Sequence, residues 1–348
     1  MHQAELLVVF GLAAAVTWVA GITLADATDG IDHHFGLGEA LGGMLLLGFA
    51  GTLPEIAITV SAALGGHLAL ATGNLLGGIA IQTLILALLD LTSHKARPLE
   101  DLSDAVEPML EALLVILVVA IILTGPLLSP TATVGPVSPA SIGVVVAYVM
   151  GMWLLSRVRK RQPWTAGANQ LAETAEDEPS RTAAPRGRFA AASARTVVMW
   201  FGVAALATLA AGVALEQTGS ALADGWGING AIFGATILAA VTALPEVSTG
   251  MRAVRLGEVG LAMGDIFGGN AAQISLFIVA DLLAGQPVIH SADREAVWLG
   301  SLGIVMTAIA LAGLLDRPER KHFRMAPVSW AMVAAYTIGV VGLLFLQK

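Results

Sequence analysis

The 348-residue sequence contains no cysteine and few charged side chains. The missing cysteines exclude disulfides and thiolate-ligated metal centres. Only 13% of the residues are charged, whereas a soluble globular protein carries about 25%, so a water-soluble domain is not expected. The net charge of −8 provides no basic surface, and no nucleic-acid partner is predicted.

Hydrophobic residues make up 56% of the chain and gather into long runs. Each run has roughly the 20 residues that a helix needs to cross the hydrocarbon core of a bilayer. The sequence therefore predicts an all-α polytopic membrane protein that has the lipid bilayer as a partner. We place ten transmembrane helices at 4–24, 37–64, 68–91, 109–128, 138–156, 196–215, 229–253, 260–284, 295–315 and 327–346.

The basic residues predict the orientation of these helices. With ten spans, 16 of the 18 Lys and Arg residues fall on one side of the membrane. That side should be cytoplasmic, so both termini are predicted to lie outside. The first run has no basic segment before it and no small-residue cleavage site after it, which favours a helix over a signal peptide.

One connection between the predicted helices is long and polar. Residues 157–195 are rich in Ala, Pro, Glu and Arg and have no hydrophobic period, which is typical of a disordered linker. Its basic ends would also suit a lipid- or partner-binding element. The predicted domains are a first unit at 1–156, this cytoplasmic linker at 157–195, and a second unit at 196–348.

The two units repeat one another. A shift of 191 residues aligns 53–90 with 244–281, and 13 of these 38 positions are identical. Each unit would hold five helices, and because five is odd the second unit would enter the membrane from the opposite side. The predicted fold is therefore two inverted-topology five-helix repeats, in which a transport site lies near the midplane between the repeats.

A proline and a glutamate interrupt an apolar run in each unit, as Pro54–Glu55 and Pro245–Glu246. A proline inside a helix frees backbone carbonyl oxygens one turn back, and a glutamate that faces lipid costs about 2.5–3.5 kcal/mol. Both features are tolerated where they line a cavity. The recurrence favours a cation site over the alternative, a pair of protonated glutamates that cap broken helices. The freed oxygens are expected near Ala50, Gly51, Val241 and Thr242.

A glycine-rich motif is expected to face each glutamate. Its helix-breaking glycines, Gly77, Gly78, Gly268 and Gly269, allow close helix approach. Gln82 and Gln273 lie one turn further on, where their amide oxygens would point to the same face. The polar residues Asn74, Asp265 and Asn270 are predicted as entrance or secondary positions, with hydrogen bonding at helix ends as the alternative. Asp90 and Asp281 end their helices and are expected to be structural.

These motifs resemble the paired repeats of the calcium/cation antiporter superfamily, which includes the sodium/calcium and the proton/calcium exchangers. The resemblance rests on "AGTLPE" at 50–55, "VTALPE" at 241–246, "GNLLGGIAIQ" at 73–82 and "GDIFGGNAAQ" at 264–273. It extends over nearly the whole chain. The resemblance implies that Glu55 and Glu246 are central calcium ligands and that Thr52 and Thr242 occupy the hydroxyl positions of the family.

The chain departs from the second motif of the family at four positions. Gly78 and Gly269 stand where the family has serines, and Gln82 and Gln273 stand where it has Asn or Asp. In sodium/calcium exchangers those side chains help to hold sodium, so their loss argues against sodium coupling. The run "GNAAQISLF" at 269–277 resembles proton/calcium exchangers instead. The short linker implies a prokaryotic form in the plasma membrane.

The predicted function is a secondary active transporter that exchanges Ca²⁺ against H⁺ or Na⁺ by alternating access. Two carboxylates neutralise one divalent cation, and hydroxyl, carbonyl and amide oxygens complete the flexible shell that calcium takes. The predicted cation-binding residues are Glu55, Glu246, Thr52, Thr242, Gln82, Gln273, Gly51 and Val241. Inorganic cations are thus the expected small partners. No cofactor, no enzymatic activity and no particular oligomeric state is predicted.

Three alternatives follow from the same residues. A passive cation channel would show flux without a counter-ion, and an exchanger could carry another divalent cation. An intramembrane aspartyl protease would need two membrane aspartates, but the repeat partner of Asp265 is Asn74.

For the transport cycle, we expect the helices at 4–24 and 196–215 to slide past a fixed core. The segment 26–34, which contains His33 and His34, is expected to form a cytoplasmic loop.

Overall fold

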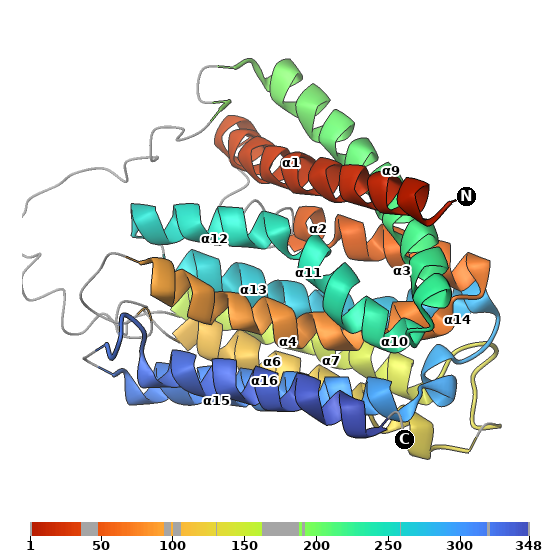
Figure 1. Cartoon of the computed structure of the whole chain (residues 1–348). Helices are drawn as coiled ribbons and strands as arrows, with labels where there is room; N and C mark the ends of the chain where they lie inside the picture. The colour runs from red at the N-terminus through yellow and green to blue at the C-terminus, as the bar shows by residue number, and fades with distance from the viewer. Residues whose placement is uncertain are drawn as a thin grey trace, which may run out of the picture.

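Figure 1 shows the computed structural model of the chain, in which the described elements are helices. The structure describes residues 2–35, 48–93, 99, 106–129, 131–161, 188–189, 192–257, 259–318 and 321–346. Within these residues the backbone forms two isolated bridges, Val134 with Val137 and His322 with Met325, and no strand. The predicted all-α class is therefore confirmed for the described residues.

Seven helices of the described residues are long and apolar enough to cross a membrane. They are α1 (Gln3–Phe35), α4 (Leu68–Thr92), α6 (Val106–Ile122) with η2 (Gly125–Leu127), α7 (Pro139–Arg161), α9 (Ala194–Trp226), α13 (Val259–Ile274) with α14 (Leu276–Ala284), and α15 (Arg294–Asp316). The protein is thus a polytopic integral membrane protein.

Further helices are broken or shorter. A bent pair joins α10 (Gly230–Phe233), η3 (Gly234–Leu238) and α11 (Ala239–Thr242) to α12 (Leu244–Leu256) and makes an eighth candidate span. The others are α2 (Gly48–Gly51), α3 (Leu53–Gly65), η4 (Val288–Ser291) and α16 (Pro327–Leu346). The count of ten stays a prediction, because 37–47 of the second predicted span lies outside the described residues.

Two predicted helix ends are wrong. The helix predicted at 4–24 continues as α1 to Phe35, so the segment 26–34 is helical and not a loop. The helix predicted at 196–215 likewise continues as α9 to Trp226. Hydropathy falls where polar residues enter the sequence, but such residues do not end a helix when they find partners. Asp26, in the extension of α1, pairs with Arg252 of α12.

The long helices α1 and α9 lie together across one face of the other helices (Figure 1). Below them are α2, α3 and α10–α13 with α4, and then α6, α7, α15 and α16. The exposed side chains of α1 include Leu7, Val8, Leu12 and Val19, which suits contact with lipid. The N and C marks lie at the same end of the bundle, which is the arrangement that an even number of spans produces.

Asp281 of α14 holds the beginning of α7. Its carboxylate is fully buried and accepts hydrogen bonds from the Ser138 amide at 3.0 Å and the Ser141 hydroxyl at 2.7 Å. The Val288 amide donates to it at 2.7 Å. A buried carboxylate with three donors is satisfied, so this side chain ties the second unit to a helix of the first.

Asp90 of α4 makes the reciprocal connection to α16. The carboxylate accepts from the Ala326 amide at 2.6 Å and from the Ser329 hydroxyl at 3.0 Å, and it pairs with Lys321 at 2.9 Å. Each unit therefore holds the last helix of the other through one buried aspartate. The prediction that Asp90 and Asp281 are structural agrees with these contacts.

Candidate cation site

Glu55 lies in the first turn of α3, directly after Pro54. Its side chain is 1% exposed, and neither carboxylate oxygen accepts a hydrogen bond of regular geometry from the described residues. Its own backbone N–H and the Thr242 hydroxyl are positioned to stabilise its charge. Free N–H groups and the dipole at a helix N-terminus favour a negative charge there, which explains how the fold keeps this acid away from water.

Glu246 occupies the equivalent place in the first turn of α12, after Pro245. Its Oε2 atom is buried and has no hydrogen-bond partner among the described residues. Glu246 and Asp265 line one cavity with Ala50, Gly51 and Pro54, the residues that precede Glu55. The structure thus brings the two predicted glutamates together and adds Asp265 to them.

The predicted threonines lie in the helix breaks. Thr52, between α2 and α3, donates its hydroxyl hydrogen to Gly48 O at 3.1 Å or to Phe49 O at 3.2 Å. Thr242, at the end of α11, donates to Ala239 O at 3.2 Å. A hydroxyl that donates to the backbone still has lone pairs to offer, so both side chains keep the ability to coordinate a cation.

The prolines free one backbone carbonyl in each unit. Pro54 and Pro245 have no N–H, so Ala50 O and Val241 O lack the donor four residues later that a continuous helix would supply. In the second unit a π-helical turn at η3 precedes α11 and the break, and α12 is bent by 43° from the preceding segment. Of the predicted backbone positions, Gly51 lines a cavity, whereas Val241 is not among the residues that line it.

Gln273 has a different contact from the one predicted. Its Nε2 atom donates to Asn74 O at 3.1 Å and to Leu75 O at 2.9 Å. A Cβ atom on Gly78 would lie 2.7 Å from that nitrogen. Gly78 therefore makes room for the amide of Gln273, which ties α13 to α4, while Gly77 allows the close approach of Ala235 in η3.

The remaining predicted polar residues are buried in the same two helices. Gln82 is 6% exposed, and its Oε1 atom has no partner among the described residues. The same holds for both side-chain polar atoms of Asn74 and for Oδ1 of Asn270, whose Nδ2 lies 3.4 Å from Thr83 Oγ1. At Gly268 and Gly269, no atom of the described chain lies within 4 Å of an added Cβ.

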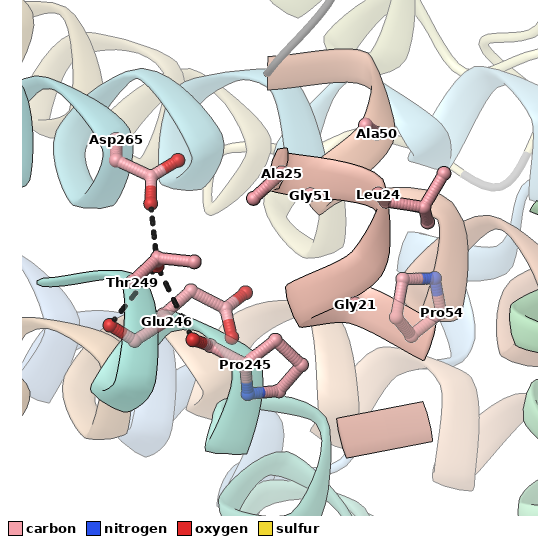
Figure 2. Close-up of a pocket in the computed structure, with 10 residues that line it drawn as sticks. All are labelled: Gly21, Leu24, Ala25, Ala50, Gly51, Pro54, Pro245, Glu246, Thr249 and Asp265. Atoms are coloured by element: carbon pink, nitrogen blue, oxygen red, sulfur yellow. Dashed lines mark hydrogen bonds between the residues drawn. The ribbon is translucent and has the colours of Figure 1, made fainter. Parts of the chain in front are cut away.

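A small cavity lies beside Glu246 (Figure 2). It offers about 20 Å³ to the centres of water-sized groups, more than the roughly 10–15 Å³ that one water needs. The cavity is lined by Gly21, Leu24, Ala25, Ala50, Gly51, Pro54, Pro245, Glu246, Thr249 and Asp265. Asp265, predicted as an entrance or secondary position, therefore lines the same cavity as Glu246.

Sequence reasoning missed the contribution of α1 and of Thr249 to this cavity. An added Cβ on Gly21 would lie 2.6 Å from Pro245 Cβ, and one on Gly212 of α9 would lie 3.1 Å from Pro54 O. Gly21 and Gly212 are separated by 191 positions, the period of the repeat. That spacing was the available signal; Thr249, one turn after Glu246, gave none beyond its polarity.

The oxygen atoms around the two glutamates suit a hard cation that is bound by few charged side chains. In the described part of the chain, no group of three or more His, Asp or Glu side chains could hold a metal ion together. Two carboxylates, two hydroxyls and backbone oxygens remain, which are the oxygen ligands that calcium accepts in flexible geometry. A cation at this site would be a transported ion, and its ligands would come from both units.

The helical bundle and its buried acids define a polytopic membrane protein with a candidate ion site. The sequence pattern described as "Sodium/calcium exchanger protein" matches residues 5–164 and 196–345. The chain belongs to this family.

Relatives and solved structures agree with this assignment. The Inner membrane protein YrbG of Escherichia coli (strain K12) is 28% identical over 307 residues, which is 87% of each chain. The H⁺/Ca²⁺ exchanger CAX superposes with a TM-score of 0.66 at 17% identity, over 98% of this chain and 87% of that one. The sodium-calcium exchanger NCX_Mj gives 0.60 at 15% identity, over 97% and 98%. At these identities the solved structures establish the fold.

Proposed function

We propose that this protein is a calcium:cation antiporter. One observation carries the proposal: Glu55 and Glu246 come from different units, lie in the first turns of two proline-broken helices, and directly follow Pro54 and Pro245, which line one cavity. Buried carboxylates without regular hydrogen bonds are costly inside a membrane. A divalent cation between them would remove that cost, which is a reason for the fold to keep both.

The proposed cation-binding residues are the two glutamates with Thr52, Thr242, Gln82, Gln273, Gly51 and Val241. The contacts of Thr52 and Thr242 leave hydroxyl lone pairs available. Calcium takes six to eight oxygen ligands in irregular geometry, whereas magnesium demands a near-ideal octahedron. Calcium is therefore the better cargo for a site assembled from side chains and freed carbonyls.

We also propose ten helices in two inverted five-helix repeats, formed by 1–156 and 196–348 and joined by a cytoplasmic linker at 157–195. The middle of that linker, 162–187, lies outside the described residues. Support comes from the reciprocal contacts of Asp90 and Asp281 and from the termini at one end of the bundle (Figure 1). Both termini would lie outside, in a prokaryotic plasma membrane.

Protons are the proposed counter-ion. Gly78 and Gly269 bring no hydroxyl to the site. Sodium would thus have fewer side-chain ligands. Two carboxylates held close together do not easily stay ionised at once, so protons can replace the departing calcium ion. The exchanger CAX, which shares the fold, is an H⁺/Ca²⁺ exchanger.

Alternating access would use α1 and α9 as the moving pair. They lie on one face of the bundle, and each meets a core helix through a glycine, Gly21 at Pro245 and Gly212 at Pro54. Small residues allow helices to approach and slide.

Uptake of radioactive calcium into proteoliposomes tests the proposal, with sodium and pH gradients imposed separately. We expect the pH gradient to drive uptake and the sodium gradient to drive little. Uptake that follows the calcium gradient alone, with no counter-ion flux, would indicate a channel. Competition by magnesium, manganese or strontium identifies the cargo; if no gradient drives calcium uptake, the proposal is wrong.

A further inference from the structure

The cavity of Figure 2 lies off the centre between the two glutamates. Its lining includes Glu246, Thr249 and Asp265 of the second unit, and Glu55 is not among the residues that line it. Figure 2 shows Asp265 and Glu246 on either side of Thr249, with the helix that carries Gly51 across the cavity. The polar groups of the cavity therefore come chiefly from α12 and α13.

The first unit has no equivalent polar group at two of these positions. The 191-residue shift places Ile58 opposite Thr249 and Asn74 opposite Asp265. Ile58 is fully buried and apolar, and Asn74 carries no charge. The additional hydroxyl and carboxylate thus belong to one unit only, so the requirements of the repeated fold do not explain them.

Oxygen atoms outnumber hydrogen-bond donors in this part of the cavity. Thr249 Oγ1 lies 3.2 Å from Pro245 O, 3.3 Å from Glu246 O and 3.4 Å from Asp265 Oδ2. A hydroxyl has one hydrogen, and the two backbone oxygens can also accept amides one turn later in α12. Glu246 Oε2 is buried and has no partner among the described residues. A cation would satisfy Glu246 Oε2 and the Asp265 carboxylate, whose one donor in the described part of the chain is the distant Thr249 hydroxyl.

The second oxygen of Asp265 also faces the cavity. An added Cβ on Gly51 would lie 3.9 Å from Asp265 Oδ1, so this oxygen points across to α2. Asp265 lies within α13 (Val259–Ile274), where it is not needed to cap a helix end. Its one hydrogen bond to a described residue is the long contact with Thr249, so its carboxylate is free to bind a ligand.

We propose that Glu246, Thr249 and Asp265 form a second station for a divalent cation, next to the central site. The inference rests on the proposed function. Two carboxylates match the charge of one divalent ion, and Glu246 belongs to both sites, so one ion would occupy them in turn. The station lies between Glu55 and the C-terminal end of α12, and a cation that leaves the central site toward that end reaches it first.

Calcium titration of the purified full-length protein by calorimetry tests the station. In the Glu55→Gln variant the central site loses a carboxylate, and we expect weaker but measurable calcium binding at the station. Adding Asp265→Asn should weaken that remaining binding by about tenfold or more, since a lost charged ligand contributes over about 1.4 kcal/mol. Adding Asp265→Glu should largely preserve it.

Asp224→Asn in the Glu55→Gln background is the matched control, because Asp224 is exposed on α9 and outside the cavity. It should leave calcium binding unchanged. Melting temperatures of all variants show whether each one is folded. If Glu55→Gln binds no calcium, or if Asp265→Asn changes nothing in that background, the station does not exist while the antiporter proposal stands. If the wild-type protein binds no calcium, both proposals fail.

Discussion

At the scale of single residues, four acidic side chains of this protein fall into two kinds according to their hydrogen-bond partners. Asp90 and Asp281 have three donors each and join helices of different units. Three of the four carboxylate oxygens of Glu55 and Glu246 are buried and have no regular partner among the described residues. The first kind stabilises the fold, whereas the second kind is costly unless a proton or a cation is bound. This contrast supports the proposed roles of Glu55 and Glu246.

The structural role of Asp281 leads to a stability prediction. Asp281→Ala leaves the Ser138 amide and the Ser141 hydroxyl without their acceptor, and each unsatisfied buried donor costs about 1–3 kcal/mol. We expect the free energy of unfolding to fall by about 2–5 kcal/mol, measured as a lower melting temperature in detergent. Asp224→Ala, at an exposed position, is the control. Equal melting temperatures for Asp281→Ala and the wild type would refute the structural role.

Helices are the elements that position the site. α3 and α12 both begin with a proline in the first turn, which fixes the glutamate that follows among unpaired backbone N–H groups. The outer helices α1 and α9 then approach these breaks through Gly21 and Gly212. The site therefore depends on the fit between a broken core helix and a continuous outer helix.

This fit predicts a transport defect at Gly21. In Gly21→Ala the new Cβ would lie 2.6 Å from Pro245 Cβ, so α1 must shift away. We expect calcium uptake to slow by about tenfold, since a barrier increase of about 1.4 kcal/mol is enough, while calcium binding changes little.

Gly11→Ala is the control for this variant, because no described atom lies within 4 Å of a Cβ at Gly11. It introduces the same methyl group on the same helix and should transport at the wild-type rate. Calcium uptake by Gly21→Ala at the rate of Gly11→Ala would show that the contact between α1 and α12 does not limit transport.

At the scale of the whole molecule, the sequence predicted those features that the bilayer itself requires. Hydrophobic runs gave the positions of the helices, since a bilayer selects length and apolarity, and the repeat indicated Glu55 and Glu246. The ends of α1 and α9 were not predictable, because their polar extensions depend on partners such as Arg252. The role of Thr249 in the cavity was not predictable either, since it depends on how α12 packs against α13.

The predicted orientation of the whole molecule can be tested by labelling, because the chain has no cysteine. His2→Cys should react with a membrane-impermeant maleimide in intact cells. Ser180→Cys, in the linker at 157–195, should react only after the membrane is opened. The inverse labelling pattern would show that the protein has the opposite orientation. Labelling of both positions in intact cells would contradict the cytoplasmic location of the linker.

Calcium uptake by Glu55→Gln and Glu246→Gln is the most direct test of the central claim, that one site is built from both units. Each substitution keeps the side-chain size and removes one of the two carboxylate charges. We predict that either one alone reduces pH-driven uptake of radioactive calcium to the level of protein-free liposomes, while both variants stay folded and Asp224→Asn transports normally. Wild-type uptake by either glutamine variant would contradict the claim that the two glutamates form a single transport site.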